Sequence, residues 1–515
     1  MQVKHRTETR NRETEMNEKT EFRNAWMIFT KRLIFLQHIV RMPPEDRLTL
    51  SPSSRNPASM LEYCRVFKKG CTMNIILLSG GSGKRLWPLS NDIRSKQFIK
   101  LFKRPDGSYE SMIERVYRQI RTVDPEARVT IATSRTQVSS ILNLLGTDVN
   151  ISVEPTRRDT FPAIALASAY LHEKCHVPED ESVVVCPVDP YVNDDYFHAL
   201  KALSEQADKG EANLVLMGIE PTYPSEKYGY IIPEAKAPVS TVRTFKEKPD
   251  EATAREYLKQ GALWNGGVFA YKLGYVLDRA RTLLNTSDYQ TLFDHYAELR
   301  KISFDYAVVE HEAKIQVMCF HGEWKDLGTW NTLTEEMSEP VIGHGILGEH
   351  CEDVHIVNEL SVPILAMGLE HAVISASPQG ILVSNLEASA RIKPYVDQLP
   401  DQIMFARKSW GDFRILDVSQ GSMTVKIEMR PGAHMSYHAH HARNEIWTVL
   451  DGRGTAIVDG EARSVCAGDV ISIPCGAKHT MRADPETPLT LMEMQLGEDI
   501  AVADKTKFDM PTEKE

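Results

Sequence analysis

The run Met73-Asn74-Ile75-Ile76-Leu77-Leu78-Ser79-Gly80-Gly81-Ser82-Gly83-Lys84-Arg85-Leu86-Trp87-Pro88-Leu89-Ser90 decides the fold of the chain. Its apolar start predicts a buried strand, and the glycines that follow leave backbone N–H groups open at the end of that strand. Phosphate oxygens can approach such a loop closely because no Cβ is in the way. The run therefore predicts an α/β fold with a phosphate-binding loop, whose candidate residues are Ser79, Gly80, Gly81, Gly83, Lys84 and Arg85.

This loop differs from two common phosphate-binding motifs. A Walker A loop would have a glycine at position 78 and Ser or Thr at position 85, where this chain has Leu78 and Arg85. A dinucleotide-binding fingerprint would have its third glycine at Leu86. A plain tight turn would explain the glycines, but not the Arg-Leu-Trp-Pro sequence directly behind them.

The bulk composition sets limits on the class of protein. A chain of 515 residues is too long for one hydrophobic core, which predicts about two to four domains. The net charge of −11 argues against nonspecific binding of nucleic acid. Positive charge for binding phosphate must therefore be local.

Cysteine usage and hydropathy predict a cytoplasmic protein without membrane insertion. The eight cysteines are scattered and form no C-x-x-C pair, which is typical of reduced thiols. The most apolar early stretch, residues 26–40, is interrupted by Lys31, Arg32, Gln37 and His38. This pattern fits neither a spanning helix nor a signal peptide.

Residues 1–72 differ in character from the rest of the chain. They carry 14 Lys and Arg against 8 Asp and Glu, while the remaining residues carry 46 against 63. We expect a disordered extension or a mis-called start, with Met73 as the initiator. The alternative is a basic arm that docks on a membrane or a partner, with residues 26–40 as its amphipathic part.

Apolar strands alternate with helical stretches over residues 73–337, as in an α/β domain. We expect strands over residues 74–79, 129–133, 151–153, 182–186 and 213–218, and helices over residues 111–120 and 161–175. Ligands of parallel sheets bind beyond the carboxyl ends of the strands. The polar residues that follow these strands are therefore candidates for a site, and they include Lys96, Glu154, Arg158, Asp159 and Asp189.

These motifs together resemble the sugar-nucleotide pyrophosphorylases, and the Arg-Leu-Trp-Pro-Leu-Ser variant is similar to that of the mannose-1-phosphate guanylyltransferases. The resemblance implies a Rossmann-like nucleotidyltransferase domain. It also implies direct in-line transfer, in which GTP and α-D-mannose 1-phosphate give GDP-mannose and diphosphate. No covalent nucleophile is implied.

Lys96 matches the lysine of the family's Pro-Lys-Gln-Phe element, in which Ser95 replaces Pro. The resemblance implies that Lys96 binds the nucleotide phosphates. Glu154, Arg158 and Asp159 match the segment that lines the base and ribose pocket, although Asp159 could equally be a helix N-cap. Asp189 matches the family's Pro-Ala-Asp-His element, and Asp326 matches Trp-x-Asp-x-Gly-Ser/Thr-Trp. This pair of hard-oxygen ligands is expected to bind Mg²⁺.

The resemblance also implies a sugar-binding set. Gly229 lets the hexose approach the backbone, Glu247 and Asn265 bond its hydroxyls beside Gly266, and Lys248 binds the sugar phosphate. The expected catalytic residues are therefore Arg85, Lys96, Asp189, Lys248 and Asp326. A solvated charge run beside Pro249 is the alternative interpretation of residues 246–248.

The C-terminal third carries a second signal. We expect a short β-helix connector over residues 338–400, an all-β cupin barrel over residues 401–500 and a tail over residues 501–515. His438 and His440 share one strand face because the side-chain period is two. With Glu445 and His479 they predict a site for a divalent transition metal or Zn²⁺.

The barrel resembles type II mannose-6-phosphate isomerase through Arg407, Trp410, Gly411, Arg443 and Trp447. His438 stands where bifunctional relatives usually have Gln, and their Tyr-Gly-Arg ending is absent. An isomerase and a structural or sensing barrel therefore both stay open. For the whole chain, the alternatives are another base or hexose 1-phosphate, or a non-catalytic sugar-nucleotide sensor. A homo-oligomer is compatible with all of them.

Overall fold

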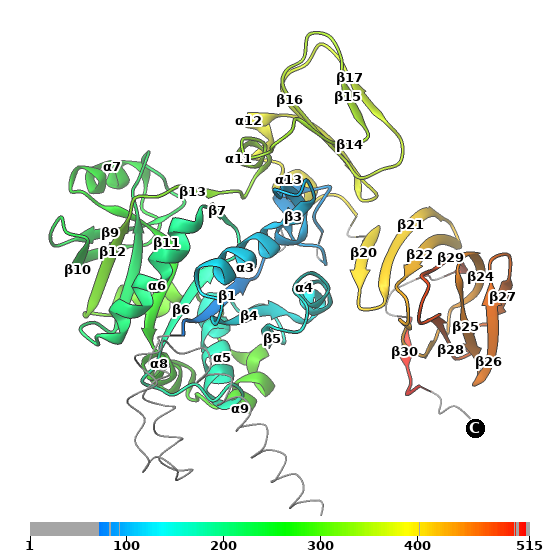
Figure 1. Ribbon diagram of the computed structural model, residues 1–515, viewed down its shortest axis with the longest axis horizontal. Helices are drawn as coiled ribbons and strands as arrows, with labels where there is room; N and C mark the ends of the chain where they lie inside the picture. The colour runs from blue at the N-terminus through cyan, green and yellow to red at the C-terminus, as the bar shows by residue number, and fades with distance from the viewer. Residues whose placement is uncertain are drawn as a thin grey trace, which may run out of the picture. The chain divides into compact units, whose positions relative to one another are not determined.

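The computed structural model describes residues 72–81, 84–91, 93–400, 402–498, 500 and 504–510. Gly83 of the predicted loop and the segment 1–71 lie outside these described residues. Residues Thr72–Glu515 form one compact unit, which we divide into an α/β body (72–337), a connector (338–400) and a barrel (402–510) (Figure 1). No helix among the described residues is long and apolar enough to cross a membrane.

A nine-stranded mixed sheet forms the centre of the α/β body, in the order β5-β4-β1-β6-β11-β8-β12-β10-β9. The strands expected from the sequence are all present, and β1 has the predicted bounds. The sheet comprises β1 (Asn74–Ser79), β4 (Arg128–Ser134), β5 (Asn150–Glu154), β6 (Ser182–Pro187), β8 (Leu214–Ile219), β9 (Gly229–Pro233), β10 (Val239–Lys246), β11 (Leu263–Lys272) and β12 (Ile315–Phe320).

The register of the parallel strands aligns their carboxyl ends. Ser79 of β1 lies beside Thr133 of β4, and Ser134 lies beside Glu154 of β5. On the other side of β1, Leu78 pairs with Pro187 at the end of β6. The glycine loop and the polar residues after β5 and β6 therefore leave the sheet along one edge.

Helices cover both faces of the sheet, because alternate side chains of each strand point to opposite faces. In β1, Ile75 and Leu77 belong to one buried cluster and Ile76 belongs to another. The first cluster includes α3 (Met112–Val123), α4 (Val138–Leu145) and α6 (Asp194–Asp208); the second includes α5 (Thr160–Glu173) and α8 (Leu273–Leu284). The result is a three-layer α/β/α body (Figure 1).

The connector is a short stack of β-coils, as expected. Its strands β14 (Val341–Gly343), β16 (Glu352–Asn358) and β18 (Glu370–Ser377) pair in parallel, and β19 (Gly380–Asn385) closes the stack antiparallel. Val357 and Val373 share a buried cluster with Leu86 and Leu89, which follow the glycine loop. The connector is thus packed against the loop that the sequence singled out.

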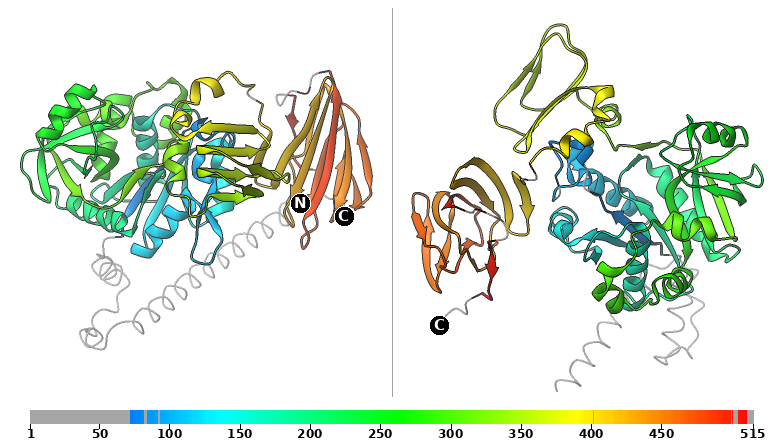
Figure 2. Two further views of the ribbon diagram at one scale, coloured as in Figure 1. Left: turned by 90° about the horizontal axis from the view of Figure 1, so that it is seen from above. Right: turned by 180° about the vertical axis from the view of Figure 1, so that it is seen from behind.

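Two facing sheets build the C-terminal barrel (Figure 2). One has the order β20-β21-β22-β29-β24-β27 and the other β26-β25-β28-β23-β30. The last strand, β30 (Thr506–Lys507), pairs with β23 (His438–Ala439), so part of the expected tail contributes to the barrel. The strands are β20 (Phe405–Lys408), β21 (Gly411–Ser419), β22 (Ser422–Met429), β24 (Arg443–Asp451), β25 (Arg453–Val458), β26 (Glu461–Cys466), β27 (Val470–Ile473), β28 (His479–Ala483) and β29 (Leu489–Gly497).

Candidate active site and metal centre

The α/β body brings two predicted acids together around one lysine. The short strands β7 (Pro190–Val192) and β13 (Trp324–Asp326) pair antiparallel, with Asp326 opposite Pro190. The Lys96 Nζ atom lies 2.9 Å from Asp189 Oδ2 and 3.7 Å from Asp326 Oδ1. Burial on its own lowers the pKa of Lys96, but the two carboxylates outweigh it and the pKa is raised. Lys96 is therefore a charged ammonium between two carboxylates.

The acid pair fits a hydrated divalent cation. The side chains of Asp189 and Asp326 are 38% and 37% exposed, so an ion that keeps part of its water shell can reach them. Mg²⁺ is commonly bound through one or two carboxylates together with substrate phosphates. A Cβ at Gly328 would lie 3.1 Å from Asp326 Oδ1, so a side chain at that position would crowd the carboxylate.

The lysine segment is tied to the glycine loop. Gln97 donates a hydrogen bond of 3.1 Å from Nε2 to the Ser79 hydroxyl at the end of β1. The positive charge of Arg85 is close enough to lower the pKa of Lys96, although the two acids outweigh it. The structure therefore brings together Ser79, Arg85, Lys96 and the acid pair. Lys84, by contrast, pairs at 3.3 Å with Asp397 of the connector.

The residues after β5 lie farther along the same edge of the sheet. The Tyr296 hydroxyl donates to Glu154 Oε2 at 2.8 Å, and burial raises the pKa of Glu154. Arg158 donates to the carbonyl oxygen of Ala297. Asp159 is the N-cap of α5, where its carboxylate accepts from the Thr160 amide at 2.8 Å. In this structure Asp159 therefore makes the contact of a helix N-cap, which is the alternative that the sequence left open.

The predicted sugar-side residues converge at the pairing of β9 with β11. Asn265 lies opposite Gly229, and a Cβ on Gly229 would be only 2.5 Å from Glu247 Oε2. That oxygen is buried and has no hydrogen-bond partner in the described structure. Glu247 Oε1 accepts from Lys248 Nζ. An unsatisfied buried acceptor beside a bare glycine backbone suits a ligand hydroxyl.

A further acid in this region, Asp305, escaped the sequence analysis. Asn265 Nδ2 donates to Asp305 Oδ1 at 2.7 Å, which fixes the orientation of the amide. Burial, followed by the nearby charge of Glu247, raises the pKa of Asp305 to about 6. The sequence signal was present: Ser303 caps the short helix α10 (Phe304–Ala307), which places an acid in the first turn beside the buried Phe304.

The barrel assembles the three predicted histidines. One ring nitrogen from each of His438, His440 and His479 can be chosen so that all lie within 4.8 Å of one another. In each ring Nδ1 contacts a backbone carbonyl oxygen, those of Ser436, Asp504 and Ala477 respectively. A ligating histidine normally uses its other nitrogen for such a bond, so this arrangement leaves Nε2 of His438 and His479 for a metal. His440 Nε2 lies 3.0 Å from Arg443 Nη2, so that contact has to give way before His440 can ligate.

Glu445 contacts two of these histidines. Its two carboxylate oxygens lie 3.2 Å from His440 Nε2 and 3.3 Å from His479 Nε2. Burial tends to raise the pKa of Glu445, but the contact with His479 outweighs it and lowers the pKa to about 2. Burial lowers the pKa of His438 to about 3. Neutral imidazole and ionised carboxylate are the protonation states that metal binding requires.

Other polar residues surround this histidine group. Arg443 donates to Glu445 Oε1 at 3.2 Å, and Trp447 donates to Glu493 Oε2 at 3.1 Å. Burial and the charge of Glu445 raise the pKa of Glu493 to about 7. Glu493 could not be predicted from the sequence, because a single Glu on a long strand carries no recognisable spacing.

Comparisons with known proteins agree with this division. The family model described as nucleotidyl transferase matches residues 74–340, and the model described as mannose-6-phosphate isomerase C-terminal matches residues 400–510. The mannose-1-phosphate guanylyltransferase of Klebsiella pneumoniae is 29% identical, over 84% of this chain and 98% of that protein. The xanthan biosynthesis protein XanB of Xanthomonas campestris pv. campestris (strain B100) is 30% identical, over 84% and 97%.

A solved structure is also similar. It is described as mannose-1-phosphate geranyltransferase from Thermus thermophilus, is 29% identical, and has a TM-score of 0.54 over 64% of this chain and 99% of that one. The first family model spans more than half of the chain and ends just beyond the α/β body. The chain belongs to the nucleotidyl transferase family.

Proposed function

We propose that the α/β body transfers the guanylyl group of GTP to α-D-mannose 1-phosphate, which gives GDP-mannose and diphosphate. The observation that carries the proposal is the position of Lys96 between Asp189 and Asp326, beside the glycine loop. The names of the relatives support the choice of base and sugar.

The reaction exchanges one phosphoanhydride bond for another. A phosphate oxygen of mannose 1-phosphate attacks the α-phosphorus of GTP, and the bond from that phosphorus to the β-phosphate oxygen breaks in line. Because the attacking phosphate is already ionised at neutral pH, no strong general base is needed. Catalysis then depends on positioning and on neutralisation of charge.

The residues divide this work by location. Ser79, Gly80, Gly81, Gly83 and Arg85 cradle the triphosphate, Lys96 contacts its α-phosphate side, and Glu154 and Arg158 border the nucleoside. Glu247, Asn265 and the backbone at Gly229 and Gly266 hold the hexose, while Lys248 binds its phosphate. A magnesium ion held by Asp189 and Asp326 would add positive charge to the phosphate oxygens.

The direct test is diphosphate release from purified protein with Mg²⁺, mannose 1-phosphate and each nucleoside triphosphate in turn. We expect release with GTP. Release with only another triphosphate would support the proposed reaction but show that the substrate carries a different base. A panel of hexose 1-phosphates tests the choice of sugar in the same way. No release with any combination would favour the non-catalytic sensor.

A second function is proposed for the barrel, which we infer to interconvert mannose 6-phosphate and fructose 6-phosphate. The change moves a proton between C1 and C2 and needs no oxidant. The observation in its favour is the buried group of His438, His440, His479 and Glu445, whose Nε2 and carboxylate atoms suit a divalent transition metal or Zn²⁺.

The isomerase proposal is tested by incubating the metal-loaded protein with fructose 6-phosphate and measuring mannose 6-phosphate. Formation that is lost in His440→Ala supports it. Bound metal without isomerisation would favour a structural or sensing barrel. A cytoplasmic location remains part of the proposal, because the described cysteines are free thiols.

A further inference from the structure

Hydrogen bonds within the α/β body hold the segment that carries Lys96. Gln137 donates from Nε2 to the Ser95 hydroxyl, and Gln97 donates to the Ser79 hydroxyl. These bonds fix the residues immediately before and after Lys96. They do not reach Asn91, Ile93 and Arg94, the described residues of the turn that leads into the segment.

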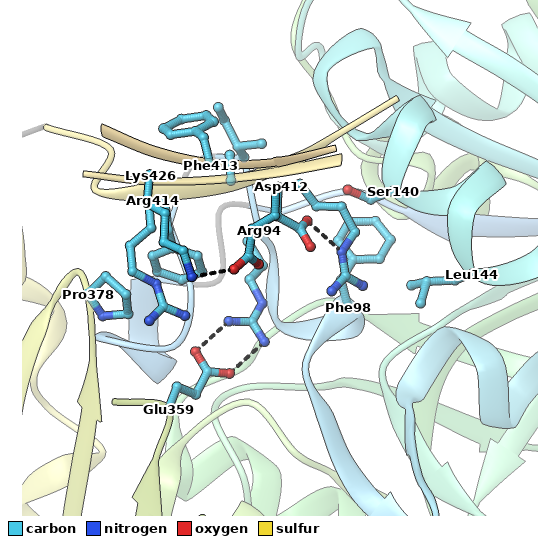
Figure 3. Close-up of a pocket in the computed structure, with 15 residues that line it drawn as sticks. Arg94, Phe98, Ser140, Leu144, Glu359, Pro378, Asp412, Phe413, Arg414 and Lys426 are labelled. Atoms are coloured by element: carbon cyan, nitrogen blue, oxygen red, sulfur yellow. Dashed lines mark hydrogen bonds and ion pairs between the residues drawn. The ribbon is translucent and has the colours of Figure 1, made fainter. Parts of the chain in front are cut away.

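The connector holds that turn through an arginine–glutamate pair. Arg94 donates from Nη1 and Nη2 to the two carboxylate oxygens of Glu359, each at 2.7 Å (Figure 3). The barrel contacts the arginine of this pair, because the ring of Phe405 lies 5.2 Å from the guanidinium carbon. Two parallel charge-assisted bonds between planar groups fix orientation as well as distance.

Asn91 links the same turn to the connector and the barrel. Its Oδ1 accepts from the amides of Ile93 at 2.9 Å and Arg94 at 2.7 Å. Its Nδ2 donates to Gln379 Oε1 at 3.4 Å and to the carbonyl oxygen of Phe405 at 3.1 Å. The Asn91 side chain is buried, so this one residue ties the entry to the lysine segment to both neighbouring parts of the chain.

Ser95 explains why the turn needs external support. Its backbone has φ −72° and ψ 163°, and this φ lies within the range that a proline ring would impose. The motif that this segment resembles has proline at the position. Serine has no ring to restrict φ, so the same backbone conformation depends on the contacts around it.

We propose that Arg94 and Glu359 act as positioning residues, which hold the entry turn so that Lys96 stays between Asp189 and Asp326. The connector is then a working part of the nucleotidyl transfer site, although no residue of it contacts the acid pair in the described structure. This inference rests on the proposed function of Lys96.

The test compares Arg94→Met and Glu359→Gln with the unmodified full chain. We expect kcat for diphosphate release to fall about 10- to 100-fold, the range for a small displacement of a catalytic group. The KM for mannose 1-phosphate should stay within about twofold, because the sugar-side residues do not touch the turn. The thermal midpoint should match that of the control described next.

The matched control is Arg430→Ala. Arg430 of the barrel also reaches the α/β body, where it donates to Asn143 Oδ1 at 2.6 Å, but neither residue adjoins Lys96. A rescue variant sharpens the comparison. The charge exchange Arg94→Glu with Glu359→Arg should restore part of kcat.

Hydrogen exchange provides a readout that does not need activity. The amides of Phe98 and Ile99 close the Lys96 turn, and they should exchange faster in Glu359→Gln than in Arg430→Ala. If the unmodified chain is inactive with every triphosphate, the transferase proposal fails and exchange still tests the positioning. If the chain is active and Arg94→Met equals the control in both kcat and exchange, the positioning proposal is overturned alone.

Discussion

The acid pair of the α/β body and the histidine group of the barrel, which we propose as two cation sites, have opposite surroundings. Asp189 and Asp326 are more than a third exposed and already contact the ammonium of Lys96. The three histidines are almost fully buried, and Glu445 with them. The first site balances fixed charges in contact with solvent, while the second encloses neutral ligands and one carboxylate.

This difference in exposure indicates how readily each site can exchange a bound cation with solvent. A cation that joins two accessible carboxylates and a substrate phosphate can arrive and leave with the substrate. Burial keeps the pKa of His438 and of His440 below the usual range, so a cation has to displace no proton from these two imidazoles at neutral pH. We therefore expect a transient ion in the α/β body and a resident ion in the barrel.

The largest effect should come from removing one acid of the exposed site. Asp189→Asn keeps the shape of the side chain and removes its charge, so kcat for diphosphate release should fall by about 10²- to 10³-fold. The metal content of the barrel, measured by mass spectrometry of the dialysed protein, should be unchanged. If Asp189→Asn were as active as the unmodified chain, the charge of the acid pair would not contribute to the reaction, and the contrast between the two sites would fail.

The converse substitution tests the enclosed site. His479→Ala removes a ligand, so the barrel should lose its ion on dialysis, with affinity reduced by more than the roughly 100-fold seen for lost supporting bonds. Diphosphate release should stay within about twofold of the unmodified chain. His441→Ala is the matched control, since His441 is an exposed neighbour that contacts Thr506 instead. Retention of the ion in His479→Ala would contradict the proposed ligand set.

A buried acid gives the α/β body a pH dependence of its own. The pKa of Asp305 is raised from 3.8 to about 6, so the folded protein binds this proton more tightly than the unfolded chain. Stability from this group is therefore present at low pH and is lost as the pH rises through about 6.

The variant Asp305→Asn cannot ionise, so it should not lose stability as the pH rises through about 6. We expect its thermal midpoint to exceed that of the unmodified chain by several degrees at pH 7.5, from about 2 to 3 kcal/mol, and to show little difference at pH 4. Scanning calorimetry at both pH values measures this. A midpoint that is lower at pH 7.5 would mean that the hydrogen bond from Asn265 outweighs the cost of burying the charge.

The smallest effect is predicted at Asp159. Its φ of 70° suits glycine, and a glycine N-cap usually costs only a few tenths of a kcal/mol relative to Asp. Asp159→Gly should therefore change the thermal midpoint by no more than about 1 °C and leave the KM for GTP unaltered. A rise of tenfold or more in that KM would restore the alternative in which Asp159 lines the nucleotide pocket.

The sequence was most informative where a signal is local. The strand at residues 74–79 has the expected bounds, because an apolar run that ends in glycines defines both ends of the element. The resemblance to a nucleotidyltransferase is confirmed by the family match over residues 74–340. The grouping of His438 and His440 with His479 is also observed, since fixed spacing on neighbouring strands brings them together.

The features of the site that could not be predicted depend on contacts between residues that are far apart in the sequence. Glu359 is 265 positions from Arg94, and nothing in either local sequence indicates that they meet. Asp305 sits in a four-residue helix whose first residue, Phe304, is buried against the ring of Phe269. Such residues become visible only when the packing of the chain is known.

The pairing of β23 with β30 bears on how the chain matures during synthesis. The carbonyl oxygen that orients His440 belongs to Asp504, which lies 64 residues later. On a translating ribosome, Asp189 and Asp326 can meet as soon as residue 326 has emerged. The histidine group has to wait for residue 504. The two acids can thus meet on the nascent chain before the carbonyl oxygen that orients His440 is available.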